Sequence, residues 1–192
     1  MSNLKVVLLI LVAILVMSCN SNEPELYNGI VGRHQNGILN EDPTGDPDYI
    51  KEYNQAYLLY HDGKYDEALV AMRKIVEKYK NETTGSFDSP FGMAKKALVF
   101  MGRIIYEQTG SIDELRAMLE GYSQGDSRFA KFANFWRAVQ YCPEEPHKAI
   151  EIWKGIKFGE EDAQDEQYRL LYLGDTYYMI GDKEEAYKYF RE

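Results

Sequence analysis

The sequence predicts an all-α protein, a solenoid built from about four antiparallel helical hairpins. Three observations lead to this prediction. From residue 47 onward apolar residues recur at spacings of three and four, and no segment shows the alternation typical of a strand. Glycines separate paired helical segments, as Gly63 does between residues 48–60 and 65–79. The paired pattern then recurs along the chain, which is typical of repeat proteins.

Composition limits the classes of function that fit. The chain has 192 residues, of which 45% are hydrophobic and 28% charged, so it is large enough for one domain with a real core. Its 22 basic residues are outnumbered by 31 acidic ones, which gives a net charge of −9. No cluster of lysines or arginines stands out. We therefore expect no nucleic-acid partner.

The amino-terminal end reads as a targeting segment. Lys5 precedes an apolar run over residues 6–17, V-V-L-L-I-L-V-A-I-L-V-M. A membrane-spanning helix needs about 20 such residues, so the run fits the core of a secretory signal peptide better. The next residues complete V-M-S-C at 16–19, which resembles the lipobox of bacterial lipoproteins. That resemblance implies that residues 1–18 are removed and that Cys19 carries lipid. An ordinary signal peptide or a short membrane anchor is the alternative.

Residues 19–46 are predicted to be the lipidated cysteine and a flexible tether, because they are rich in Asn, Gly and Pro and show no helical period. A lipidated Cys19 leaves Cys142 as the remaining cysteine, without a disulfide partner in the chain. No nucleophile pattern surrounds Cys142. We therefore expect a buried and unreactive thiol there.

Residues 47–192 form the predicted helical repeat domain. In its second helical segment one face collects apolar residues at positions 68, 72, 75, 76 and 79. Similar hairpins follow at residues 97–119, 132–156 and 168–190. The residue that opens each second helix marks the phase, and these four residues are Ala68, Leu115, Ala149 and Ala186. One hairpin cannot bury its own apolar face, so we expect the copies to stack.

The copies resemble the tetratricopeptide repeat. The last copy is the most similar, and the residues that carry the likeness are Leu173, Gly174, Tyr177, Gly181, Ala186 and Phe190. The first copy keeps Ala56, Tyr60, Gly63, Tyr65 and Ala68, whereas the third departs most, with two prolines at its turn. The resemblance implies a right-handed solenoid whose concave face is lined by the first helix of each hairpin. It also implies that this face binds a partner.

Several helix ends can be read from the sequence. Pro47 and Pro90 each follow a capping residue, so both are predicted at a first helical position. Ser111 and Glu114 have the spacing of a capping box. Residues 81–90 are an added loop, and the final helix is predicted over 183–192.

No catalytic constellation can be named, so we predict that the protein is not an enzyme. Its three histidines are far apart in sequence, and no phosphate-binding or hydrolase motif is present. The acidic segment G-E-E-D-A-Q-D-E at 159–166 lacks the spacing of a calcium loop. We expect it to be a solvated helix start, where acids favour the positive end of the dipole. Neither a metal nor another cofactor is expected.

The resemblance places the candidate partner-binding residues on the first helices. They are Tyr53, Tyr57, His61, Lys96, Arg103, Glu107, Lys131, Asn134, Tyr168 and Asp175. A mixed aromatic and charged groove of this kind suits an extended peptide or a partner helix. The alternative for each tyrosine is that its ring simply packs between helices.

Together these expectations describe a lipid-anchored scaffold or adaptor in a bacterial cell envelope. It binds a partner protein or peptide, and it meets the membrane through its N-terminal lipid. Asn20 follows Cys19 in place of the Asp that retains lipoproteins in the inner membrane, which favours the outer membrane. The alternative function is a glycan-binding or glycan-uptake lipoprotein that uses surface tyrosines. The sequence leaves open the identity of the partner, the membrane and its side, and the oligomeric state.

Overall fold

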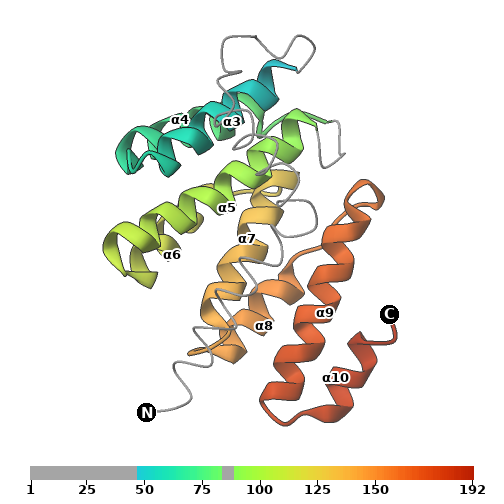
Figure 1. The fold of residues 1–192 in the computed structure, drawn as a ribbon. Coiled ribbons are helices and arrows are strands. Elements are labelled where there is room, and N and C mark those ends of the chain that lie inside the picture. The colour runs from blue at the N-terminus through green and yellow to red at the C-terminus, as the bar shows by residue number, and fades with distance from the viewer. Residues whose placement is uncertain (1–46, 84–88) are drawn as a thin grey trace, which may run out of the picture. The chain divides into compact units, whose positions relative to one another are not determined.

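The computed structural model describes residues 47–83 and 89–192, and within them it is helical throughout. Figure 1 shows the helices, labelled in chain order. Their bounds are α3 (Asp48–His61), α4 (Tyr65–Tyr79), α5 (Pro90–Thr109), α6 (Ile112–Tyr122), α7 (Arg128–Tyr141), α8 (Pro146–Gly155), α9 (Ala163–Met179) and α10 (Lys183–Tyr189), with a short 3₁₀ turn η1 (Glu160–Asp162) before α9. The predicted all-α fold is confirmed.

The eight α-helices of the described residues form four consecutive hairpins, α3–α4, α5–α6, α7–α8 and α9–α10 (Figure 1). The two helices of each hairpin contact one another, and each hairpin contacts the next. First helices also touch directly, α3 with α5, α5 with α7 and α7 with α9. A continuous core therefore runs through the array, as stacked repeats require. None of the described helices has the length and hydropathy needed to cross a membrane.

Glycines and serines set the helix ends. Gly63, Gly110 and Gly181 lie between the helices of three hairpins with φ of 75°, 65° and 91°, a backbone conformation that residues with a Cβ adopt at a cost. At the start of α5, Ser89 accepts a hydrogen bond from the backbone N–H of Gly92 at 3.0 Å, and Pro90 is the first helical residue. This predicted start is confirmed.

Three predicted helix ends differ from the structure. Pro47 precedes α3 instead of opening it. The capping box of α6 is half formed: Ser111 accepts from the N–H of Glu114 at 3.2 Å, but its own N–H donates to the Thr109 hydroxyl at 3.0 Å. The nearby hydroxyl thus takes the place of the Glu114 carboxylate. The last helix ends at Tyr189, and turns replace its predicted final residues.

Small residues let the helices approach closely, as the repeat pattern predicts. The alanines Ala56, Ala68, Ala149 and Ala186 are fully buried. A Cβ added to Gly102 would lie 2.7 Å from a methyl group of Leu115, which opens the second half of the same hairpin. Bulky side chains fill the remaining spaces, and Met72, Leu119 and Trp153 are buried. Phe190 packs against Gly174 but stays 42% exposed.

Candidate binding face on the first helices

Aromatic rings gather where α3 meets α5. Tyr53 stacks on Tyr57 with ring centroids 6.5 Å apart, and Tyr57 contacts the His61 ring at 4.5 Å. Phe100 of α5 is buried between two α3 rings, 5.1 Å from Tyr57 and 4.9 Å from Tyr60. These five side chains, which we call the α3–α5 aromatic cluster, join the first two hairpins.

An ion pair between Arg103 and Glu107 lies beside this cluster, in contact with Tyr60. The Tyr60 hydroxyl donates to the Glu107 carboxylate, with oxygen–oxygen distances of 2.9 and 2.7 Å. Arg103 Nε donates to the same carboxylate at 2.9 Å, and its guanidinium lies 5.3 Å from the Tyr60 ring centroid. Burial and the bond to Glu107 raise the pKa of Tyr60 to about 12. Tyr60 therefore stays protonated at neutral pH and acts as a hydrogen-bond donor.

Five of the ten predicted binding residues meet in this region: Tyr53, Tyr57, His61, Arg103 and Glu107. Lys96 lies further toward the start of α5 and is half-buried. The sequence reasoning missed Tyr60 and Phe100, which hold the region together. Tyr60 follows Tyr57 by three residues, and that helical spacing was the available signal.

The two residues predicted on α7 are turned toward the preceding loop. The Asn134 side-chain amide donates to the backbone carbonyl of Ser123 at 2.9 Å, and Lys131 pairs with Asp126 at 3.3 Å. Both partners lie between α6 and α7. Asn134 thus bonds within its own chain, while apolar α7 side chains contact the neighbouring helices. Phe135, for example, lies 5.3 Å from the Tyr172 ring of α9.

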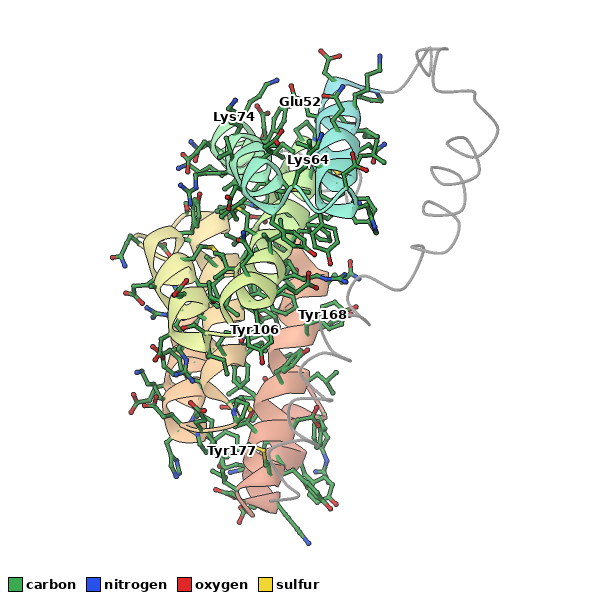
Figure 2. All side chains as sticks on the ribbon, turned by 60° about the vertical axis from the view of Figure 1, so that its left-hand side comes forward. Glu52, Lys64, Lys74, Tyr106, Tyr168 and Tyr177 are labelled. Carbon is green, nitrogen blue, oxygen red and sulfur yellow. The ribbon has the colours of Figure 1, made fainter. Side chains whose placement is uncertain are left out.

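The residues predicted on α9 lie on an exposed stripe. Tyr168, labelled in Figure 2, and Asp175 are both exposed. Leu171, Tyr178 and Met179, which the sequence reasoning did not select, are exposed beside them. Their spacing of three and four residues from Tyr168 and Asp175 puts all five on one side of the helix. The signal that would have found them is apolar side chains at positions that face away from the core.

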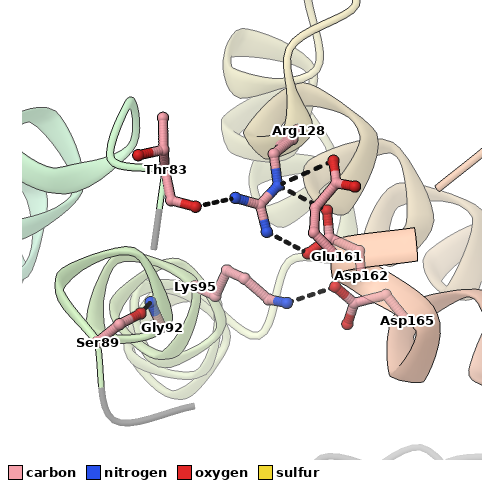
Figure 3. Close-up of polar contacts among 8 residues, drawn as sticks. All are labelled: Thr83, Ser89, Gly92, Lys95, Arg128, Glu161, Asp162 and Asp165. Carbon is pink, nitrogen blue, oxygen red and sulfur yellow. Dashed lines mark hydrogen bonds and ion pairs between the residues drawn. The ribbon is translucent and has the colours of Figure 1, made fainter. Parts of the chain in front are cut away.

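Ion pairs fix the starts of three first helices relative to one another (Figure 3). Arg128, at the start of α7, donates from Nε and Nη2 to the two carboxylate oxygens of Asp162, each at 2.7 Å, and from Nη1 to the Thr83 carbonyl at 2.9 Å. Lys95, near the start of α5, pairs with Asp165 of α9. The hydrogen bond to Asp162 raises the pKa of Arg128, so that arginine keeps its charge.

These pairs correct the expectation that residues 159–166 are a solvated helix start. Asp162 is 6% exposed, and burial raises the pKa of Asp165 even though Lys95 lies beside it. Glu160 and Glu161 do remain exposed at the positive end of α9. The two aspartates instead form buried or half-buried pairs with residues from other hairpins, which positions the first-helix face.

Cys142 follows α7 and is half-buried. Its Sγ lies 3.3 Å from the Thr176 hydroxyl of α9. Burial raises the pKa of the thiol, so the thiolate that would act as a nucleophile is disfavoured at neutral pH. In residues 47–83 and 89–192, no three His, Cys, Asp or Glu side chains come together as a metal site would need.

Cys19 and the whole of residues 1–46 lie outside the described residues, as do residues 84–88 of the predicted loop at 81–90. The domain boundaries at 18 and 46 therefore stay predictions. So does the lipid attachment at Cys19.

Comparison with known proteins supports the repeat assignment at both ends of the array. The family model described as tetratricopeptide repeat matches residues 52–81 and residues 170–192. The first match covers most of α3 and all of α4, and the second covers the latter part of α9 and all of α10. No significant match was found among curated proteins or among solved structures. The first and last hairpins are thus similar in sequence to tetratricopeptide repeats, and the two between them share their helical-hairpin form.

Proposed function

We propose that this chain is a protein-interaction scaffold of the tetratricopeptide type, which binds a partner protein or peptide through the face formed by α3, α5, α7 and α9. The observation that carries the proposal is the exposed stripe on α9. Most large apolar side chains of a folded protein are buried. On α9, however, four of them are exposed beside Asp175, namely Tyr168, Leu171, Tyr178 and Met179. Such a surface suits a helix or an extended segment of another protein.

We further propose that the scaffold is tethered to a bacterial membrane by lipid on Cys19 and works in the cell envelope. The support is the V-M-S-C sequence at 16–19 after a 12-residue apolar run. A body of net charge −9 gains nothing from anionic headgroups, so stable attachment requires an anchor of its own. The outer membrane is the proposed location, because Asn20 follows the cysteine.

A photo-crosslinking experiment in cells tests the binding face. A benzoyl-phenylalanine in place of Tyr168 is expected to give a discrete adduct of higher mass on irradiation. The same residue in place of Lys74, an exposed position on the second helix α4, serves as the matched control and is expected to give none. Adducts of equal yield from both positions, or none from Tyr168, would overturn the proposed face.

Cell fractionation tests the anchor independently. The Cys19→Ser chain is expected to leave the membrane fraction, whereas the unsubstituted chain stays there. A Cys142→Ser variant is the control, because that half-buried thiol has no part in the anchor. A Cys19→Ser chain that remains membrane-bound at the size of the processed protein would show that lipid attachment is wrong.

A further inference from the structure

The exposed stripe on α9 is defined by five residues at 168, 171, 175, 178 and 179. Its four apolar members, Tyr168, Leu171, Tyr178 and Met179, are 46%, 48%, 52% and 52% exposed. The buried residues of α9 lie on the other side of the helix, among them Leu173, Gly174 and Tyr177. At 100° per residue the five exposed positions span an arc of roughly 100°, which is the width of an apolar face that normally packs against something. Within residues 47–83 and 89–192, the stripe is therefore a helix face that no other helix covers.

Asp175 sits in the middle of this stripe. Among the described residues it makes no hydrogen bond or ion pair. Burial is the main cause of the raised pKa values of Tyr172 and Cys142, and the nearby Asp175 charge raises both further. Desolvation raises its own pKa, which reflects the apolar groups around it. A carboxylate that is partly desolvated and unpaired gains most from a cation brought to it.

Two cations near the stripe contact groups other than Asp175, and one of them, Lys183, lies on the stripe itself. Lys183, at the start of α10, lies over the Tyr178 ring at 5.8 Å from its centroid. Arg169 points to the opposite side of α9, where it pairs with Glu166 and donates to the Trp153 carbonyl at 3.1 Å. Asp175 thus differs from Glu107, the acid beside the α3–α5 aromatic cluster, whose carboxylate already accepts hydrogen bonds from Arg103 and Tyr60.

We infer that the α9 stripe docks a partner segment that carries Lys or Arg between apolar side chains. The apolar side chains cover Tyr168 and Leu171 on one side of Asp175 and Tyr178 and Met179 on the other, and the cation pairs with Asp175. The inference rests on the proposed function and names the chemistry of the partner at this part of the face. Charge complementarity favours a basic partner segment over an acidic one. An acidic segment would be repelled by Asp175 and by a chain whose net charge is −9.

A second copy of the chain fits the stripe poorly. A symmetric dimer on this face would bring two Asp175 side chains together, since a two-fold interface pairs each patch with itself. Two like charges in an apolar interface cost free energy unless a cation separates them. The chain is also acidic as a whole, which opposes self-association further.

Selection from a displayed library of random 12-residue peptides, with the full chain in detergent as the target, tests the inference. The unsubstituted chain is expected to enrich peptides with Lys or Arg flanked within four positions by apolar residues. Asp175→Arg is expected to shift the enrichment to Asp or Glu. Glu151→Arg, the same charge change at an exposed position of α8, is the matched control and is expected to leave the enrichment unchanged.

Titration calorimetry with a synthetic copy of the most enriched peptide gives the magnitude. Asp175→Asn removes the charge and keeps the shape, and it is expected to weaken binding about tenfold or more, as the loss of a hydrogen bond to a charged group does. Circular dichroism of each variant must show unchanged helix content. If Asp175→Arg does not fold, the calorimetry with Asp175→Asn still tests the inference.

Three results would overturn the inference. One is enrichment without a basic residue, or no enrichment at all, on the unsubstituted chain. Another is the same peptide preference on Asp175→Arg. The third is a concentration-dependent dimer in analytical ultracentrifugation that Asp175→Arg abolishes, which would assign the stripe to a second copy. The crosslinking experiment at Tyr168 is separate, so a partner found there without a basic preference would leave the proposed face intact and this inference wrong.

Discussion

Replacing Arg128 with Met should destabilise the protein by about 3 kcal/mol. The change removes both bonds to Asp162 and the bond to the Thr83 carbonyl, and it leaves the Asp162 carboxylate buried with no guanidinium opposite it. Breaking a buried pair in this way costs about 3–5 kcal/mol. The Arg128 side chain is 21% exposed, so we expect the lower end of that range.

The partner substitution, Asp162→Asn, should cost less, about 1–2 kcal/mol. Arg128 then keeps the Thr83 carbonyl, its place over the Phe91 ring at 4.4 Å and the Glu161 carboxylate at 3.7 Å, and solvent reaches it. The double variant should cost less than the sum of the two, with a coupling of about 1–2 kcal/mol, because the two side chains are in direct contact.

Urea unfolding followed by circular dichroism gives these free energies. Tryptophan fluorescence from Trp136 and Trp153 supplies a second probe, since the free energies are meaningful only where the two transitions coincide. Lys188→Met removes an exposed pair on α10 and is the control, which is expected to leave the urea midpoint almost unchanged. If Arg128→Met cost no more than Lys188→Met, or if the cycle showed no coupling, the role given to the Arg128–Asp162 pair would be wrong.

Two further predictions concern packing and pH. A methyl group on Gly174 would overlap the Phe190 ring, so Gly174→Ala should lower stability by about 1–3 kcal/mol, measured as a fall in the urea midpoint. An unchanged midpoint would show that moving the ring costs no more than the roughly 1 kcal/mol that Ala gains over Gly inside a helix. Hydrogen bonds from Arg169 lower the pKa of Glu166 below its usual 4.5, so the pair adds stability that is present above pH 4.5 and lost as the pH falls through the lower folded value. Glu166→Gln should therefore destabilise the protein at pH 6, and this destabilisation should shrink as the pH falls below 4.5. Urea titrations over a series of pH values would show the trend, and a destabilisation that stays constant as the pH falls would contradict this account.

Local sequence pattern was enough to predict the hairpins. The small residues at 68, 149 and 186 and the glycines in the turns report on contacts within one hairpin or with its neighbour. Because such contacts recur in each hairpin, the residues that make them recur at similar intervals in the sequence, and the hairpins can be predicted from that spacing. The serine caps of α5 and α6 were readable for the same reason, because each depends on residues within four positions.

Contacts between distant side chains were not readable. Nothing near Asp162 shows that Arg128, 34 residues earlier, will reach it, so a solvated helix start was the natural expectation. Asn134 has the repeat position expected of the proposed binding face, but its amide donates to the Ser123 carbonyl 11 residues earlier. Both contacts depend on the conformation of the loops between helices. Loop conformation produces no repeating pattern in the sequence, so these contacts could not be predicted from it.

The pair of Lys95 and Asp165 has a consequence for how the array comes apart. In most repeat arrays each unit touches only its neighbours, so units at the end fray without disturbing the rest. Here a side chain of the second hairpin reaches the fourth, past the third. Melting of the last hairpin must therefore release a charge held on α5. The last three hairpins should open together, as one cooperative unit, and hydrogen exchange of α5, α7 and α9 should report similar opening free energies.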